Sequence, residues 1–289
     1  MLLVQMTSYV ELTLWGGLTA PKKEAVEAIG IFLPDPHPSI MAAGAPAQTF
    51  FDILSRCRST DHLFSVVDEH YHASHNANNT PSPHALRYYN PTEYHITEVA
   101  LFKQRYVVQH EGFVFRVHHQ PQDTLPAEPD FLVAVDRNID STKTGFSFVK
   151  FAVDHVSCSL VHPTAPELEG TFRRPIVWRM PAPHHDYIFD MNLYQISVLF
   201  EVIRQWTSEY HVTRRNCFWQ SYIIRTAIHE IIQSQQQLGI TVTAYEPVVH
   251  GVTIGNCFGF HFVPEDQGET TEIVNKYHGL YGWLQGAQA

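Results

Sequence analysis

The hydrophobic period of the chain changes near residue 192, and this change most constrains the fold. Between residues 98 and 191, β-branched and aromatic residues form short runs separated by segments rich in Pro and Gly, which is typical of strands. From Leu193 onward the apolar residues recur three or four positions apart, which is typical of a helix. Strands followed by helices indicate an α+β fold. We therefore expect an antiparallel sheet packed against two long helices, at about 193–209 and 217–238.

Periodicity and turn residues predict the remaining elements. A hairpin is expected with Glu111-Gly112 at its turn, because β-branched and aromatic residues lie on both sides. Its strands and the further strands are predicted at 8–15, 98–109, 112–120, 131–136, 145–153, 156–162, 175–180, 185–191, 240–250 and 257–263. Short helices are predicted at 47–56, 61–69 and 270–278, with a polar loop at 73–92. The chain divides either into an N-terminal region, 1–95, and a core domain, 96–289, or forms a single domain.

Composition and charge argue against several kinds of partner. The formal net charge is −10, whereas phosphate binding needs clustered Lys and Arg, so nucleic acid is not expected. No apolar run is long enough to span a membrane, and the N-terminus lacks the basic start of a signal peptide. The four cysteines contain no C-x-x-C pair, which favours free thiols in a reducing compartment. We expect a cytoplasmic protein that needs no cofactor and acts on a small-molecule or peptide substrate, and its oligomeric state stays open.

Cys217 is the strongest candidate for chemistry. It follows Asn216, a good N-cap residue, and therefore stands in the first turn of the second long helix. The positive end of the helix dipole, together with Arg214 and Arg215, favours a thiolate over a thiol there. A cysteine in such a position can be a nucleophile if a histidine elsewhere in the chain serves as its base.

The base is expected in the segment 181–191, which reads as a strand that opens with two histidines. Alternation places His185 on the same face as Tyr187, Phe189 and Met191, and His184 on the other face. The first face is apolar and is expected to pack against the helix that carries Cys217. His185 is therefore the predicted base.

Other side chains can support this pair. The candidates for this support are Asn216, His184 and His162. The third member that would orient the base stays open among His162, Asp154 and Glu201, since no spacing selects one of them.

A strand histidine followed by an Asn-Cys-aromatic helix start resembles the circularly permuted papain-like superfamily, which includes NlpC-type hydrolases and the lecithin–retinol acyltransferase-like and deSUMOylase-like (PPPDE) proteins. It is also similar to uncharacterised mushroom proteins with a His-Glu-Tyr strand and an Asn-Cys-Tyr-Trp-type helix start. The corresponding residues here are His185-Asp186-Tyr187 and Asn216-Cys217-Phe218-Trp219. The resemblance covers about residues 175–235 and implies a thiol-dependent hydrolase or acyltransferase that acts on an amide, ester or isopeptide bond.

Two alternatives stay open beside this hypothesis. Cys217 can be structural, with Phe218 and Trp219 anchoring the helix, in a non-catalytic protein that binds a ligand in a histidine-rich pocket. The second alternative is a metal-dependent enzyme, because imidazole and carboxylate groups are common zinc ligands. Its candidate ligands are His70, His72 and His75, which otherwise read as part of a solvated loop.

Overall fold

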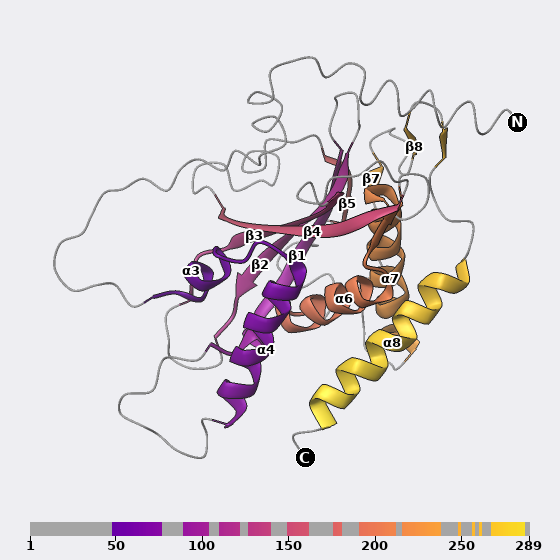
Figure 1. Ribbon diagram of the computed structural model, residues 1–289. Helices are drawn as coiled ribbons and strands as arrows, with labels where there is room; N and C mark the ends of the chain where they lie inside the picture. The colour runs from indigo at the N-terminus through magenta and orange to yellow at the C-terminus, as the bar shows by residue number, and fades with distance from the viewer. Residues whose placement is uncertain are drawn as a thin grey trace, which may run out of the picture. The chain divides into compact units, whose positions relative to one another are not determined.

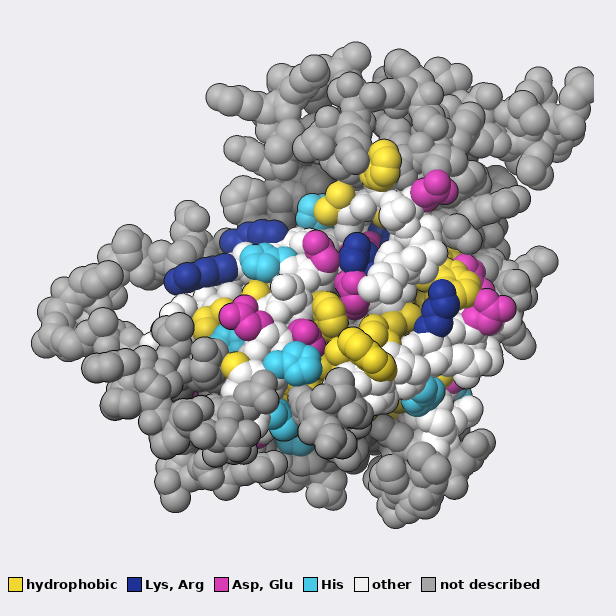
Figure 2. Space-filling view, turned by 60° about the horizontal axis from the view of Figure 1, so that its bottom comes forward, with side chains coloured by type: hydrophobic (Ala, Val, Ile, Leu, Met, Phe, Trp, Pro, Cys, Tyr) yellow, Lys and Arg dark blue, Asp and Glu magenta, His cyan; other side chains and the backbone are white. Residues whose placement is uncertain are grey.

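The computed structural model describes residues 48–76, 89–103, 110–121, 127–139, 149–161, 176–180, 191–211, 216–237 and 267–286, and the pairs 248–249, 256–257 and 260–261. The predicted strand 8–15, and the predicted strand 185–191 apart from Met191, lie outside these residues. None of the helices in the described ranges is both long and apolar enough to cross a membrane. Acidic, basic and histidine side chains are interspersed with hydrophobic ones on the face in Figure 2.

A seven-stranded sheet forms the centre of the described part (Figure 1), with the strand order β6-β4-β3-β2-β1-β5-β7. Every neighbouring pair in it is antiparallel. The strands are β1 (Tyr94–Lys103), β2 (Glu111–His119), β3 (Phe131–Ile139), β4 (Val149–Leu160), β5 (Ile176–Met180), β6 (Glu209–His211) and β7 (Val248–Val249). A separate two-stranded sheet pairs β8 (Asn256–Cys257) with β9 (Phe260–His261).

Helices pack against this sheet, which confirms the predicted α+β class. The helix α6 contacts β1, and α7 contacts β2 and β3 (Figure 1). The C-terminal helix α8 packs on both α6 and α7, while α4 packs on α6. The helices are α3 (Phe50–Leu54), α4 (Thr60–Asn76), α6 (Leu193–Trp206), α7 (Cys217–Gln237) and α8 (Gln267–Gly286), with a short 3-10 helix, η2 (Pro91–Glu93).

Aromatic side chains join the layers in one hydrophobic core. Phe115 of β2 meets Phe200 of α6 edge to face, with ring centroids 5.4 Å apart. Tyr71 of α4 stacks on Tyr194 of α6 at 3.9 Å, and the Tyr194 hydroxyl donates to Asp68 at 3.1 Å. The helices α3 and α4 therefore share a core with the sheet, although they precede the predicted domain boundary near residue 95. That boundary stays a prediction.

The predicted turn at Glu111-Gly112 is wrong. Both residues belong to β2, where Glu111 pairs with Lys103 and Gly112 pairs with Phe102 of β1. A Cβ atom on Gly112 would lie 2.5 Å from the Phe102 ring and 2.8 Å from the carbonyl oxygen of Val135. Gly112 therefore lets the Phe102 ring and the Val135 backbone approach closely inside the sheet. Such close approach is a common reason for a glycine in a strand.

Two further predicted boundaries, one between strands and one at the end of a helix, are wrong. The predicted strands 145–153 and 156–162 are one strand, β4, because Asp154 pairs with Arg137 inside the sheet instead of ending it. The helix predicted to end at Glu209 ends at Trp206, where Thr207 takes an extended conformation, and Glu209 begins β6.

Two helices are longer than predicted. The helix α4 continues to Asn76, so His70, His72 and His75 lie on a helix and not in a loop. The helix α8 spans 20 residues, Gln267–Gly286, and extends the predicted 270–278 helix at both ends.

Candidate active site

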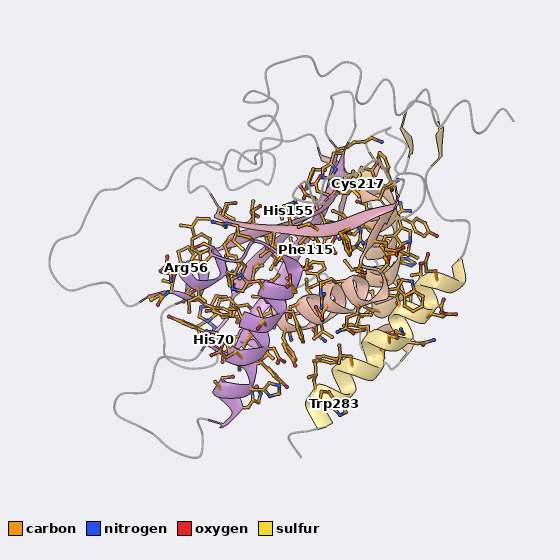
Figure 3. The ribbon with its side chains drawn as sticks, in the orientation of Figure 1. Arg56, His70, Phe115, His155, Cys217 and Trp283 are labelled. Atoms are coloured by element: carbon orange, nitrogen blue, oxygen red, sulfur yellow. The ribbon has the colours of Figure 1, made fainter. Side chains whose placement is uncertain are left out.

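Cys217 begins the helix α7, as predicted (Figure 3). The side chain of Asn216 accepts the Trp219 N–H at 3.1 Å, and its carbonyl accepts the Gln220 N–H at 3.0 Å. Asn216 is therefore the N-cap, and it holds the turn that carries the sulfur. The side chain of Cys217 is buried, with 2% of its surface exposed, at the end of the helix where backbone N–H groups favour negative charge.

The histidine that the structure brings to Cys217 is His110, which directly precedes β2. Its side chain interacts with that of Cys217 electrostatically. Its Nε2 atom lies 3.3 Å from Oδ2 of Asp136 in β3. Gly112 pairs with Asp136, so His110, two positions before Gly112, is on the same side of the β2–β3 pair as the carboxylate. The thiol of Cys217 therefore comes from α7, the imidazole of His110 from the start of β2, and the carboxylate of Asp136 from β3.

The electrostatics of His110 favour its protonated form. Burial disfavours a charged imidazole and alone would lower the pKa of His110. The interactions with Cys217 and with the carboxylate of Asp136 act against this, and together they raise the pKa of His110 above its usual value. An imidazolium beside a sulfur at a helix N-terminus stabilises the thiolate, which is the reactive form of cysteine.

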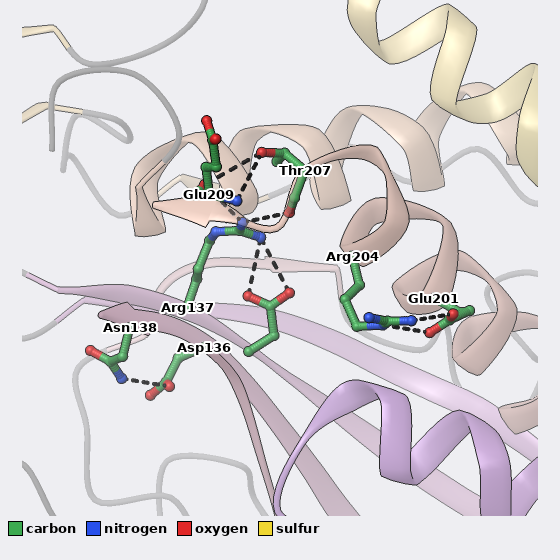
Figure 4. A network of polar contacts seen from close by, with 8 residues as sticks. Asp136, Arg137, Asn138, Glu201, Arg204, Thr207 and Glu209 are labelled. Carbon is green, nitrogen blue, oxygen red and sulfur yellow. Dashed lines mark hydrogen bonds and ion pairs between the residues drawn. The ribbon is translucent and has the colours of Figure 1, made fainter. Parts of the chain in front are cut away.

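The carboxylate of Asp136 is itself held on its second oxygen. The side-chain amide of Asn138 donates to Oδ1 of Asp136 at 3.0 Å (Figure 4). Because Oδ1 is bonded to Asn138, Oδ2 is directed to His110. A nucleophile, a base and a group that orients the base form the arrangement on which thiol catalysis depends.

Arg137, the next residue of β3, contacts α7 from the other side of the strand. Its guanidinium lies 5.3 Å from the ring centroid of Trp219, a cation–π distance. Nη1 lies 3.2 Å from each carboxylate oxygen of Asp154, and Nη2 donates to the carbonyls of Thr207 at 2.8 Å and Glu209 at 3.2 Å (Figure 4). Arg137 is fully buried, so these contacts replace its hydration and fix α7 and β6 to the sheet.

Two of the predicted third members thus have other partners. Asp154 pairs with Arg137, and Glu201 accepts two hydrogen bonds from Arg204 at 2.8 and 2.6 Å. The carboxylate that lies beside His110 is that of Asp136.

A buried ion pair flanks the site. Nζ of Lys103 in β1 lies 3.0 Å from Oε1 of Glu111, the residue that follows His110. The same ammonium lies 5.5 Å from the ring centroid of Phe218, the residue that follows Cys217. Burial lowers the pKa of Arg225, and the negative charge of Glu111 partly offsets this by raising it. The backbone on both sides of the Cys217–His110 contact is therefore anchored by neighbouring side chains.

The predicted base, His185, stays a prediction. His185, His184 and His162 lie outside the described residues. His110 and Asp136 were missed because the hairpin turn was predicted at Glu111-Gly112, which placed His110 beside a turn. A usable signal was present: a histidine just before one strand of the sheet and an aspartate on the next.

The candidate metal ligands His70, His72 and His75 each contact a different residue. No group of three or more potential metal ligands occurs within the described ranges. Nδ1 of His70 accepts the Tyr89 N–H at 3.3 Å, Nε2 of His72 lies 3.4 Å from Asp68, and Nδ1 of His75 contacts the Tyr71 carbonyl at 2.8 Å. These three side chains therefore take part in separate contacts along α4.

Two further free cysteines provide a contrast with Cys217. Cys57 and Cys158 are buried in the core, and burial raises the pKa of Cys57 to about 11. Burial also raises the pKa of Cys158. Neither starts a helix, so these two thiols are expected to be inert at neutral pH.

Comparisons of the chain with models of protein families, with curated proteins and with solved structures give no match. The functional argument therefore stands on the geometry of the site.

Proposed function

We propose that this chain is a thiol-dependent hydrolase or acyltransferase whose nucleophile is Cys217. The supporting observation is the position of His110, which contacts the Cys217 side chain and Oδ2 of Asp136. In this proposal His110 is the acid in the first step and the base in the second, and Asp136 orients its ring. The substrate carries a carbonyl group in an amide, ester or isopeptide bond.

The proposed reaction has two steps. The Cys217 thiolate attacks the carbonyl carbon, the imidazolium of His110 gives its proton to the leaving amine or alcohol, and a thioester forms as the old bond breaks. His110 then takes a proton from water or from an acceptor alcohol or amine, which attacks the thioester and releases the acyl product. His110 keeps this proton as the Cys217 thiolate leaves, which restores the thiolate–imidazolium pair. In this proposal the backbone N–H of Cys217, at the helix start, stabilises the oxyanion.

The chain order supports a permuted papain-like enzyme as the finer form of this proposal. The histidine comes first at the start of a strand, the carboxylate follows on the next strand, and the cysteine begins a later helix. The order of histidine before cysteine is the one that the sequence resemblance implies. The histidine in this order is His110, whereas the resemblance rested on His185.

The test uses a small alkylating reagent because the Cys217 side chain is buried. Purified protein is treated with iodoacetamide at pH 6.5, and peptide mass spectrometry follows each cysteine. We expect Cys217 to react at least about tenfold faster than Cys57 and Cys158, since only a thiolate is nucleophilic. His110→Gln and Asp136→Asn are expected to reduce this preference, whereas His118→Gln, which changes a histidine that pairs with Asp130, should leave it unchanged.

A second measurement follows the acyl intermediate. A p-nitrophenyl acetate burst should add one acetyl group to wild-type protein and none to Cys217→Ala. Equal labelling of all three buried cysteines, or alkylation of Cys217 only after urea unfolding, would refute the catalytic role. Such a result would favour the structural alternative for Cys217.

A further inference from the structure

Glu269 in α8 binds the indole groups of two tryptophans at once. Oε2 accepts the Nε1–H of Trp219 at 3.0 Å, and Oε1 accepts the Nε1–H of Trp206 at 2.8 Å. Trp219 belongs to the first turn of α7, and Trp206 is the last residue of α6. One carboxylate from the C-terminal helix therefore links the end of one helix to the start of the helix that carries Cys217.

Both N–H groups of Trp219 are held by hydrogen bonds. Its backbone N–H is capped by Asn216 and its indole N–H by Glu269, while Arg137 lies against its ring. The side chain is 1% exposed. Because Trp219 is two residues after Cys217, a shift of its indole tilts the first turn of α7 and moves the sulfur relative to His110.

We propose that Glu269 is a positioning residue for the nucleophile, acting through Trp219. This role rests on the proposed function, since it needs Cys217 to be reactive. Apolar packing already attaches α8, because Ile273, Val274 and Tyr277 are buried against the core. The hydrogen bonds from Glu269 to the two indoles orient α8 relative to α6 and α7. The bond to Trp219 sets the rotation of its ring and, with it, the position of the first turn of α7. The C-terminal helix is then part of the catalytic apparatus without contacting substrate.

The two indoles allow a matched test. Trp219→Phe and Trp206→Phe each remove one N–H bond to Glu269 and keep an aromatic ring, but only the first touches the turn that carries Cys217. The readout is the pH profile of the rate constant for Cys217 alkylation by iodoacetamide. We expect Trp219→Phe and Glu269→Ala to lower the rate at pH 6.5 about tenfold or more and to shift the profile towards that of His110→Gln, because small misplacements of reacting groups are costly. Trp206→Phe should keep the rate within about twofold of wild type and the shape of its profile.

Urea unfolding of each variant separates positioning from stability. Equal effects of the two tryptophan substitutions on alkylation, or lower stability with an unchanged pH profile in Glu269→Ala, would overturn the positioning role. Glu269→Gln retains one acceptor and should restore part of the rate. If wild-type Cys217 is not alkylated preferentially, the proposed function fails and the role of Glu269 fails with it. If wild-type Cys217 is preferred and Glu269→Ala reacts as fast, only the role of Glu269 fails.

Discussion

Replacement of Arg137 by methionine tests how the site is attached to the sheet. The guanidinium is fully buried, and the Asp154 side chain opposite it is 4% exposed. Methionine keeps most of the length of the side chain but removes the charge. The variant therefore leaves the carboxylate of Asp154 buried without its cation, and the carbonyls of Thr207 and Glu209 lose their donor.

The expected cost follows from the loss of one member of a buried pair. Such a loss destabilises proteins by about 3–5 kcal/mol, because the remaining charge stays desolvated. Burial already raises the pKa of Asp154, even though Arg137 lowers it, so part of the cost is relieved when Asp154 takes up a proton. We therefore expect a loss of about 3 kcal/mol in the free energy of unfolding at pH 7, and a melting temperature lower by roughly 10 °C.

Urea unfolding, followed by tryptophan fluorescence and far-ultraviolet circular dichroism, measures this loss. The double variant Arg137→Met/Asp154→Leu is the control, because replacing a buried pair by apolar residues is often neutral. We expect it to recover most of the stability that the single variant loses. A single variant that costs less than about 1 kcal/mol, or a double variant that is less stable than the single one, would refute the argument that the buried charge of Asp154 sets the cost.

Two further predictions concern the sheet. Gly112→Ala forces a methyl group against the Val135 carbonyl and should destabilise the protein by about 1–3 kcal/mol, measured by urea unfolding, whereas an equal or higher stability would show that the strands can separate there. The second prediction concerns the pair of His118 and Asp130. The hydrogen bond with Asp130 raises the pKa of His118. Burial alone would raise the pKa of Asp130, but the hydrogen bonds that its carboxylate accepts lower that pKa overall. Asp130 then contributes stability above its unfolded pKa of about 3.9, and His118 contributes below its unfolded pKa of about 6.5. The stability difference between wild type and Asp130→Asn should therefore be largest between about pH 4 and 6.5 and shrink as the pH rises through the folded pKa of His118; a difference independent of pH would contradict this.

Local patterns in the sequence predict local features of this fold well. Asn216 caps its helix through contacts within four residues, and the apolar spacing from Leu193 onward directly reports a helix. The antiparallel sheet follows from the alternation of the middle region. These features need no knowledge of how distant segments meet.

The proposed base, His110, depends on contacts between segments that are distant in the sequence. His110 and Asp136 reach Cys217 only through the pairing of β2 with β1 and β3, and the position of the turn before β2 sets which residues face each other. Gly112 allows close packing inside the sheet, but the sequence interpretation assigned it to a turn. The predicted pairing of β2 with β1 was therefore wrong around Gly112. The alternation of side chains then gave no reason to connect His110 with the cysteine.

Under the proposed function, the neighbouring positions of Asp136 and Arg137 make the reactivity of Cys217 a reporter of correct strand pairing. One residue serves the histidine and the next serves the helix, on opposite sides of the same strand. If β3 slipped by a single residue against β2, the arginine would take the place of the carboxylate beside His110, and Asp136 would turn towards Trp219. A misregistered chain could retain its secondary structure and much of its hydrophobic burial, yet it would place a positive charge where the histidine needs a negative one. Loss of thiol reactivity would then reveal misfolded molecules that circular dichroism does not distinguish from native ones.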